Sequence, residues 1–309
     1  MNNFAIVTDT TSDLSKELRE RFDIDYVICH VTYPDGKERE SKLEWDSITS
    51  EEFYQQLKKN PNGFSTSPAS PEEYKEAFKK HLDKGLDVLA LSISTGLSAT
   101  FKFMTQAAEE LKAEYPDRKV LVIDSLRYST GLGLLVIKAS QLRSEGLSVT
   151  EVYEKMEEIK NTCHQMGFLD DLSFVASKGR LTKSKAFMGK LIGIKPLGEF
   201  DYNGLTTVIA KTKGDAKAIR YSLEYMKKTI IDPENQIVFI ACTNRMKQAL
   251  EFKALIEAEV KPKEVIITEV FQSNGVNVGP GLMCGYYFGT TISKGLVKEK
   301  ELMAEIIGK

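Results

Sequence analysis

Three times in its first half, the sequence passes from a short apolar segment into small polar residues and then into a helical pattern. The apolar segments are residues 4–8, 88–93 and 120–123. After each of them, apolar residues recur every three or four positions, which is typical of an amphipathic helix. Strands that alternate with helices favour a mainly parallel sheet with helices on both faces. The sequence therefore predicts an α/β fold.

The second half of the chain predicts another α/β unit. Residues 201–211, DYNGLTTVIAK, are typical of a hairpin with Asn-Gly at its turn. The elements predicted next are a helix, a strand, a helix and a strand, at residues 215–228, 237–242, 246–260 and 265–271. Before the hairpin, residues 168–196 are expected to be helical and basic. We place the boundary near residue 160, so that the predicted domains are 1–160 and 161–309.

Composition and motifs argue against several classes of partner. The chain has 42 Lys and Arg against 44 Asp and Glu, so it has no overall field that attracts nucleic acid. We expect a cytoplasmic protein without an integral membrane segment, because no apolar run approaches the roughly 18 residues of a membrane span and the start lacks a signal-peptide pattern. No nucleotide-binding fingerprint and no His at ligand spacing occurs, so neither cofactor nor metal is expected.

Two hydroxyl-rich segments follow predicted strands or precede predicted helices. The segment VLALSISTGLSATF, residues 88–101, passes from an apolar run into Ser94 and Thr95. The segment GFSTSPASPEEYKEAF, residues 63–78, places Thr66 shortly before a helix. Hydroxyls cap helices well, and helix N-termini at the carboxyl ends of strands also favour anions. From the residues alone, capping and anion binding both remain open.

Two further segments carry candidate functional groups. Residues 276–290, VNVGPGLMCGYYFGT, predict a tight loop at Gly279–Gly281. Arg180 begins a basic run with Lys183, Lys185 and Lys190, which is either a solvated helix face or a clamp for a carboxylate or phosphate. The chain has three His residues and no G-x-S-x-G elbow at Ser94, so a serine hydrolase is not indicated.

Together these segments resemble the DegV family. The resemblance is carried, in order along the chain, by IVTDTTSDL, DSLRYSTGLGL, KGRLTKSKAFMGKLIGIKPL and VGPGLMCG. It implies two α/β domains with mainly parallel sheets and a fatty acid in the cleft between them. It also implies a bacterial fatty-acid-binding protein without catalytic activity, which presents the fatty acid to a separate fatty acid kinase.

The resemblance also implies which residues hold the acyl carboxylate. They are Thr66, Ser94, Thr95, Arg180 and Asn277. Two positions depart from the family pattern: Lys178 replaces the first glycine of a Gly-Gly-Arg element, and Asn277 replaces a histidine before Val-Gly-Pro-Gly. Asn277 can donate a hydrogen bond but cannot titrate. We therefore expect the chain to bind the ligand, while its presentation to a kinase is in question.

A second hypothesis belongs to another class of protein. The same residues are compatible with an α/β enzyme that acts on a small carboxylate or a phosphorylated metabolite, with Ser94, Arg180 and Asp124 in its site. A bound lipid in the purified protein would distinguish the two hypotheses.

Overall fold

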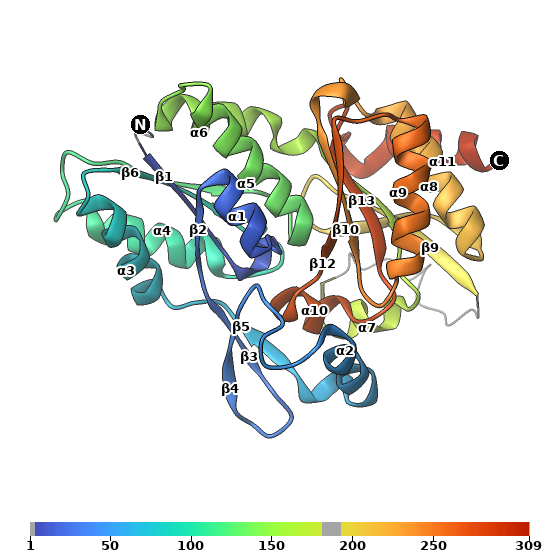
Figure 1. The fold of residues 1–309 in the computed structure, drawn as a ribbon, viewed down its shortest axis with the longest axis horizontal. Helices are drawn as coiled ribbons and strands as arrows, with labels where there is room; N and C mark the ends of the chain where they lie inside the picture. The colour runs from blue at the N-terminus through green and yellow to red at the C-terminus, as the bar shows by residue number, and fades with distance from the viewer. Residues whose placement is uncertain (1–3, 181–192, 309) are drawn as a thin grey trace. The chain divides into compact units, whose positions relative to one another are not determined.

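The structure, a computed structural model, describes residues 4–180 and 193–308. The chain divides into two compact units, whose elements are labelled in Figure 1. Unit 1 comprises Met1–Asp46, Asn62–Lys160 and Phe271–Asn274, and unit 2 comprises Ser47–Pro61, Asn161–Val270 and Gly275–Lys309. Each unit therefore contains a short segment of chain from the half that builds the other unit.

Unit 1 is built on a parallel sheet. Among the described residues its strands are β1 (Phe4–Asp9), β2 (Ile24–Val27), β6 (Asp87–Ser92) and β7 (Val120–Asp124), in the order β2-β1-β6-β7. All neighbouring strands are parallel. The whole of β1 is buried, as expected for a strand covered by helices on both faces. The predicted parallel α/β sheet is therefore confirmed for this unit.

Helices cover both faces of this sheet (Figure 1). They are α1 (Lys16–Phe22), α3 (Pro71–Leu82), α4 (Thr100–Leu111), α5 (Ser129–Ser144) and α6 (Val149–Ile159). The start of α3 follows from sequence, because Ser70 and Glu73 form a capping box and Pro71 occupies the first turn. Apolar residues of α3 and α4 pack in one cluster with Val7 and Ala90 of the sheet.

A small antiparallel sheet extends unit 1. Its strands are β3 (Cys29–Thr32), β4 (Glu38–Ser41) and β5 (Ser65–Ser67), in the order β4-β3-β5. Thr66 lies in β5 opposite Val31. The sequence showed a hydroxyl-rich helix start here but not the strand, because three residues are too few to show a strand period.

Unit 2 contains a mixed sheet. The strands of the described residues are β8 (Cys163–Phe168), β9 (Ile194–Phe200), β10 (Thr206–Lys213), β11 (Ile237–Cys242), β12 (Glu264–Glu269) and β13 (Met283–Phe288), in the order β10-β9-β8-β13-β11-β12. The predicted β9–β10 hairpin is present. Of these neighbouring pairs, β11 with β12 is parallel and the others are antiparallel. The expectation of mainly parallel sheets is therefore wrong for unit 2, because β13 lies antiparallel between β8 and β11.

Two helices of the second half, α8 (Asp215–Thr229) and α9 (Met246–Glu259), lie where they were predicted, whereas α10 (Gln272–Val278) and α11 (Val297–Ile307) were not predicted. With α2 from the first half, the described helices are α2 (Ser50–Lys59), α7 (Leu172–Ser177), α8 (Asp215–Thr229), α9 (Met246–Glu259), α10 (Gln272–Val278) and α11 (Val297–Ile307). Within the described part of residues 168–196, the predicted helical segment is helical at α7. Residues 181–192 lie outside the described residues, and β9 begins at Ile194 because its pairing with β10 overrides the local helical pattern.

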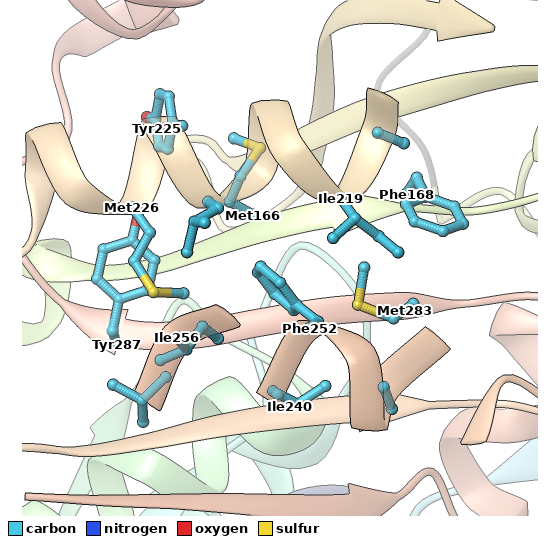
Figure 2. Packing of buried hydrophobic residues seen from close by; sticks show 14 of the residues in the cluster. Met166, Phe168, Ile219, Tyr225, Met226, Ile240, Phe252, Ile256, Met283 and Tyr287 are labelled. Carbon is cyan, nitrogen blue, oxygen red and sulfur yellow. The ribbon is translucent and has the colours of Figure 1, made fainter. Parts of the chain in front are cut away.

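The core of unit 2 lies between the sheet and the helices α8 and α9. Figure 2 shows Ile219 and Met226 of α8 and Phe252 of α9 meeting Met166 and Met283 of the sheet. All five side chains are buried. At about 1.5–3 kcal/mol for each large apolar side chain removed from water, this cluster stabilises the unit strongly.

Candidate functional site

The candidate site is the edge of unit 1 at which the parallel strands end. The first residues after β1 form a short 3₁₀ turn, Thr10–Ser12, and β7 ends at Asp124. Ser94 and Thr95 follow β6 after a single residue, Ile93. In open parallel sheets this edge is where ligands bind. The sequence pattern correctly located these hydroxyls beyond the ends of the strands.

Most hydroxyls at this edge are engaged by the protein itself. The Thr8 hydroxyl donates to the Leu91 carbonyl (3.0 Å), and the Ser92 hydroxyl donates to the Ile123 carbonyl (3.2 Å). The Ser125 hydroxyl donates to the Arg127 carbonyl (3.0 Å). These hydroxyls join neighbouring strands and turns, and their single hydrogens are already used.

Ser94 differs from these residues. It is fully buried, its N–H donates to the Arg127 carbonyl (2.9 Å), and its Oγ accepts from the Gly96 N–H (3.1 Å). Within the described ranges, Ser94 Oγ donates no hydrogen bond. A buried hydroxyl with an unused hydrogen is unfavourable unless an acceptor reaches it. Ser94 therefore has the chemistry of a ligand-binding donor.

Thr95 has a different role in the same turn. Its hydroxyl donates to Asp124 Oδ2 (2.6 Å), and its N–H donates to Asp124 Oδ1 (3.3 Å). The Leu126 N–H also donates to Asp124 Oδ1 (3.0 Å). The Asp124 carboxylate thus holds the turn after β6 against the turn after β7, and a ligand would have to compete for the Thr95 hydroxyl.

The expectation that Ser94 lies at a helix N-terminus is wrong. The helix α4 begins at Thr100, and its N-cap is Ala99. Between β6 and α4 the chain forms a turn, in which the N–H groups of Leu97 and Ser98 donate to the Ser94 carbonyl. The Ser98 Oγ accepts from the Thr100 N–H (3.3 Å), but Ser98 precedes the N-cap Ala99 and is not itself the capping residue. The helix dipole acts within the first turn, so it does not account for anion binding at Ser94.

The other predicted site residues come from three different elements. Thr66 is half-buried in β5 and belongs to unit 1. Arg180 and Asn277 belong to unit 2, where Arg180 follows α7 and donates to the Lys178 carbonyl, and Asn277 lies in the last turn of α10. The basic residues Lys183, Lys185 and Lys190 lie outside the described residues.

The predicted tight loop follows Asn277. Gly279 and Gly281 have φ angles of +76° and +101°, which L side chains rarely adopt. A Cβ on Gly281 would lie 2.7 Å from the Asp170 side chain. Both glycines are therefore required by backbone geometry, and the loop prediction is confirmed.

Two buried carboxyl groups at the same edge were not among the predicted site residues. Asp9 accepts from the Thr11 N–H (2.8 Å) and from the Tyr74 hydroxyl (2.9 Å), and burial raises the pKa of its carboxyl. Burial also raises the pKa of the Asp13 carboxyl to about 7, against hydrogen bonds from Ser129, Phe271 and Asn274 that lower it. The sequence signal was an aspartate at the end of an apolar strand, Asp9, and a second aspartate four residues later, Asp13.

Across residues 4–180 and 193–308, no group of three or more His, Cys, Asp or Glu side chains is arranged to hold a metal ion. None of the helices in those ranges is both long and apolar enough to cross a membrane.

The fold and this edge define a class of two-unit α/β proteins with a hydroxyl-rich turn at the end of a parallel sheet. A model of the DegV family of uncharacterised proteins matches residues 3–288. A DegV domain-containing protein of Clostridium perfringens is 30% identical over 294 residues, which cover 94% of this chain and 99% of that protein. The chain belongs to the DegV family.

Solved structures of the same family share the fold. A fatty-acid-binding DegV family protein from Thermus thermophilus has a TM-score of 0.80 and 25% identity, covering 93% of this chain and 99% of its own. The Streptococcus pneumoniae Fatty Acid Kinase B3 protein, loaded with linoleic acid, has a TM-score of 0.78 and 18% identity, covering 93% and 99%. The predicted α/β architecture and family are thus confirmed.

Proposed function

We propose that this protein binds a long-chain fatty acid, that Ser94 and Thr66 hold its carboxylate, and that it has no catalytic activity of its own. The observation that carries the proposal is the buried Ser94 hydroxyl, which donates no hydrogen bond within the described residues. Family membership supports the ligand class, because the similar Thermus thermophilus protein binds fatty acid. A carboxylate oxygen is the acceptor that the Ser94 hydroxyl lacks.

The chemistry of a fatty acid suits this assignment. Burial of about fourteen methylenes at roughly 0.8 kcal/mol each gives on the order of 10 kcal/mol before the cost of immobilising the chain. A hydrogen bond to a charged head contributes about 1.5–3 kcal/mol, much of which offsets desolvation. The tail therefore supplies most of the affinity, and Ser94 and Thr66 orient the head.

The remaining predicted ligand residues take secondary roles in the proposal. Thr95 shapes the turn through Asp124, and Arg180 and Asn277 are proposed as further donors to the carboxylate. Phosphorylation of the bound acid would take place on a separate fatty acid kinase that supplies ATP and Mg²⁺. The similarity to the Fatty Acid Kinase B3 protein supports this presenting role.

The head-group assignment is tested by the double variant Thr66→Val and Ser94→Ala. Loss of two donors is expected to weaken binding of palmitic acid at least tenfold, because the carboxylate keeps its desolvation cost and loses its partners. The measurement is calorimetric titration of delipidated protein. Before delipidation, solvent extraction and mass spectrometry should find close to one fatty acid per chain.

The control is Ser92→Ala, which removes a buried hydroxyl two residues from Ser94 that already donates to the Ile123 carbonyl. This variant is expected to bind palmitic acid as the wild type does. Equal affinity of the double variant and the wild type would disprove the head-group assignment. A wild-type protein that carries no lipid and takes up none would disprove fatty acid binding itself.

The presenting role is tested by Asn277→His. An imidazole at this position can carry a proton near the acyl head, which Asn277 cannot. With an added bacterial fatty acid kinase, the variant is expected to support faster formation of acyl phosphate than the wild type, at unchanged affinity for palmitic acid. If neither protein yields acyl phosphate, the chain binds a fatty acid without presenting it to that kinase.

A further inference from the structure

Four consecutive residues of the second half of the chain, Phe271–Asn274, belong to unit 1. The Tyr33 hydroxyl donates to Gln272 Oε1 (2.7 Å). The Ser273 hydroxyl donates to Ser41 Oγ (2.8 Å) and lies 3.2 Å from Thr10 Oγ1. A surface loop rarely has so many buried polar contacts over so few residues. The segment is therefore fixed in place by specific partners.

The strongest of these contacts centre on Asp13. Asp13 Oδ1 accepts from the Phe271 N–H (2.9 Å), and Asp13 Oδ2 accepts from Asn274 Nδ2 (2.8 Å) and from the Ser129 hydroxyl. Asn274 Nδ2 also donates to the Thr11 carbonyl (2.9 Å), so both of its hydrogens are used. We call Thr11, Asp13, Phe271 and Asn274 the clip.

The clip suits an aspartate in either protonation state. When the carboxylate is charged it accepts all three bonds. When it carries a proton, the Ser129 hydroxyl can reverse and accept it, which leaves both oxygens available to Phe271 and Asn274. An asparagine at this position would fail, because its amide nitrogen would face either the Phe271 N–H or the Asn274 amide.

The clip also fixes a helix that carries a predicted ligand residue. Asn274 lies in the first turn of α10, and Asn277 lies three residues later. Residues three apart share one side of a helix, so the contacts of Asn274 set the rotation at which Asn277 is presented. A slip of one residue would turn that side by about 100°.

The residues after Asn274 hold the other end of the helix. A Cβ on Gly275 would lie 2.7 Å from Tyr54 Oη, so Gly275 is packed closely against α2. The Gly279 N–H donates to the Gly275 carbonyl (2.8 Å), and the Thr243 hydroxyl donates to the Gly279 carbonyl (2.9 Å). Asn277 thus lies between two anchored points.

We propose that Asp13 and Asn274 are positioning residues of the ligand site, which act by fixing the first turn of α10 and thereby Asn277. The proposal rests on the proposed function in so far as Asn277 contacts the fatty acid head. Neither Asp13 nor Asn274 needs to touch the ligand. The clip joins residues 261 positions apart in sequence within unit 1, and α10 continues from Asn274 to Asn277.

The test uses the full-length, delipidated protein and the variants Asp13→Asn and Asn274→Ala. Each is expected to weaken palmitic acid binding at least fivefold and to speed hydrogen exchange of the Gly279 amide at least tenfold in the ligand-free protein. If Asp13→Asn does not fold, the milder Asn274→Ala gives the answer. The control is Met156→Ala, which creates a cavity in the buried face of α6. At the same loss of unfolding temperature as the clip variants, it should change neither the affinity for palmitic acid nor the exchange rate of the Gly279 amide more than twofold.

A charge exchange separates positioning from general destabilisation. Asn274→Asp places two carboxyl groups against each other and should bind most weakly, and the double variant Asp13→Asn with Asn274→Asp should bind more tightly than Asn274→Asp alone. An unchanged exchange rate of the Gly279 amide in Asp13→Asn and Asn274→Ala would overturn the proposal that the clip fixes α10. If the wild type binds no palmitic acid while Gly279 exchange still responds to the clip variants, the proposed function fails and the clip stands.

Discussion

Replacement of Glu199 by Leu is expected to lower the free energy of unfolding by about 3–5 kcal/mol, because it leaves several buried polar groups without their hydrogen-bond partner. Glu199 is fully buried in β9. Its Oε1 accepts from the N–H groups of Gln165 and Phe200, both at 2.8 Å. Its Oε2 accepts from the Tyr225 hydroxyl (3.0 Å) and lies 2.7 Å from His164 Nδ1. Leucine would leave all four groups without their hydrogen-bond partner.

The surroundings of His164 make the loss of stability in the Leu variant more severe. Its Nε2 lies 2.6 Å from the Thr290 carbonyl, which can only accept, so this nitrogen carries a hydrogen. Its ring is stacked on Tyr287 at 5.3 Å between centroids, so it cannot readily rotate to another partner. Urea-induced unfolding followed by circular dichroism measures the effect.

The matched control is Glu199→Gln. The carbonyl oxygen of the glutamine can still accept from the two backbone N–H groups. Its amide nitrogen can donate to the Tyr225 oxygen and to a neutral His164 Nδ1. The expected loss is therefore that of ordinary hydrogen-bond exchange, about 1 kcal/mol. If the Leu variant is as stable as the Gln variant, the hydrogen bonds of Glu199 contribute nothing to the free energy of unfolding beyond the packing of its side chain.

The sequence predicted elements best where local pattern and tertiary packing agree. Residues 237–242 and 246–260 were predicted as a strand and a helix, and β11 and α9 match them within one residue. Both carry apolar patterns that match the core of unit 2. Residues 194–196, which were predicted to be helical, failed this test, because the partner that makes Ile194–Phe200 extended is not visible in a local window.

The candidate site was predictable in its position but not in its bonds. Strand ends followed by hydroxyls located Ser94 and Thr95, since local sequence determines where a strand stops. Which hydroxyl keeps a spare hydrogen depends on contacts such as Thr95 with Asp124, 29 residues apart. The clip and the His164–Glu199 pair were likewise not predictable, because both depend on pairings between distant segments.

Residues 1–160 expressed alone are expected not to fold cooperatively, although the sequence places a domain boundary there. This fragment lacks Phe271–Asn274, so the buried Asp13 loses two of its donors. It retains α2, whose buried Phe53, Tyr54 and Leu57 belong to unit 2 and would be exposed. At about 1.5–3 kcal/mol for each side chain, exposure of these three alone approaches the whole stability of a domain. The measurement is urea unfolding monitored by Trp45 fluorescence.

A redesigned fragment provides the control. Residues 47–61 are replaced by a Gly/Ser linker of equal length, and residues 268–276 are attached after residue 160 through a flexible linker of about twenty residues. Because this fragment contains the whole of unit 1 and no exposed apolar helix from unit 2, it should regain a cooperative transition. A native-like transition of residues 1–160 without these changes would mean that the exchanged segments are dispensable and that the boundary near residue 160 separates two independent folding units.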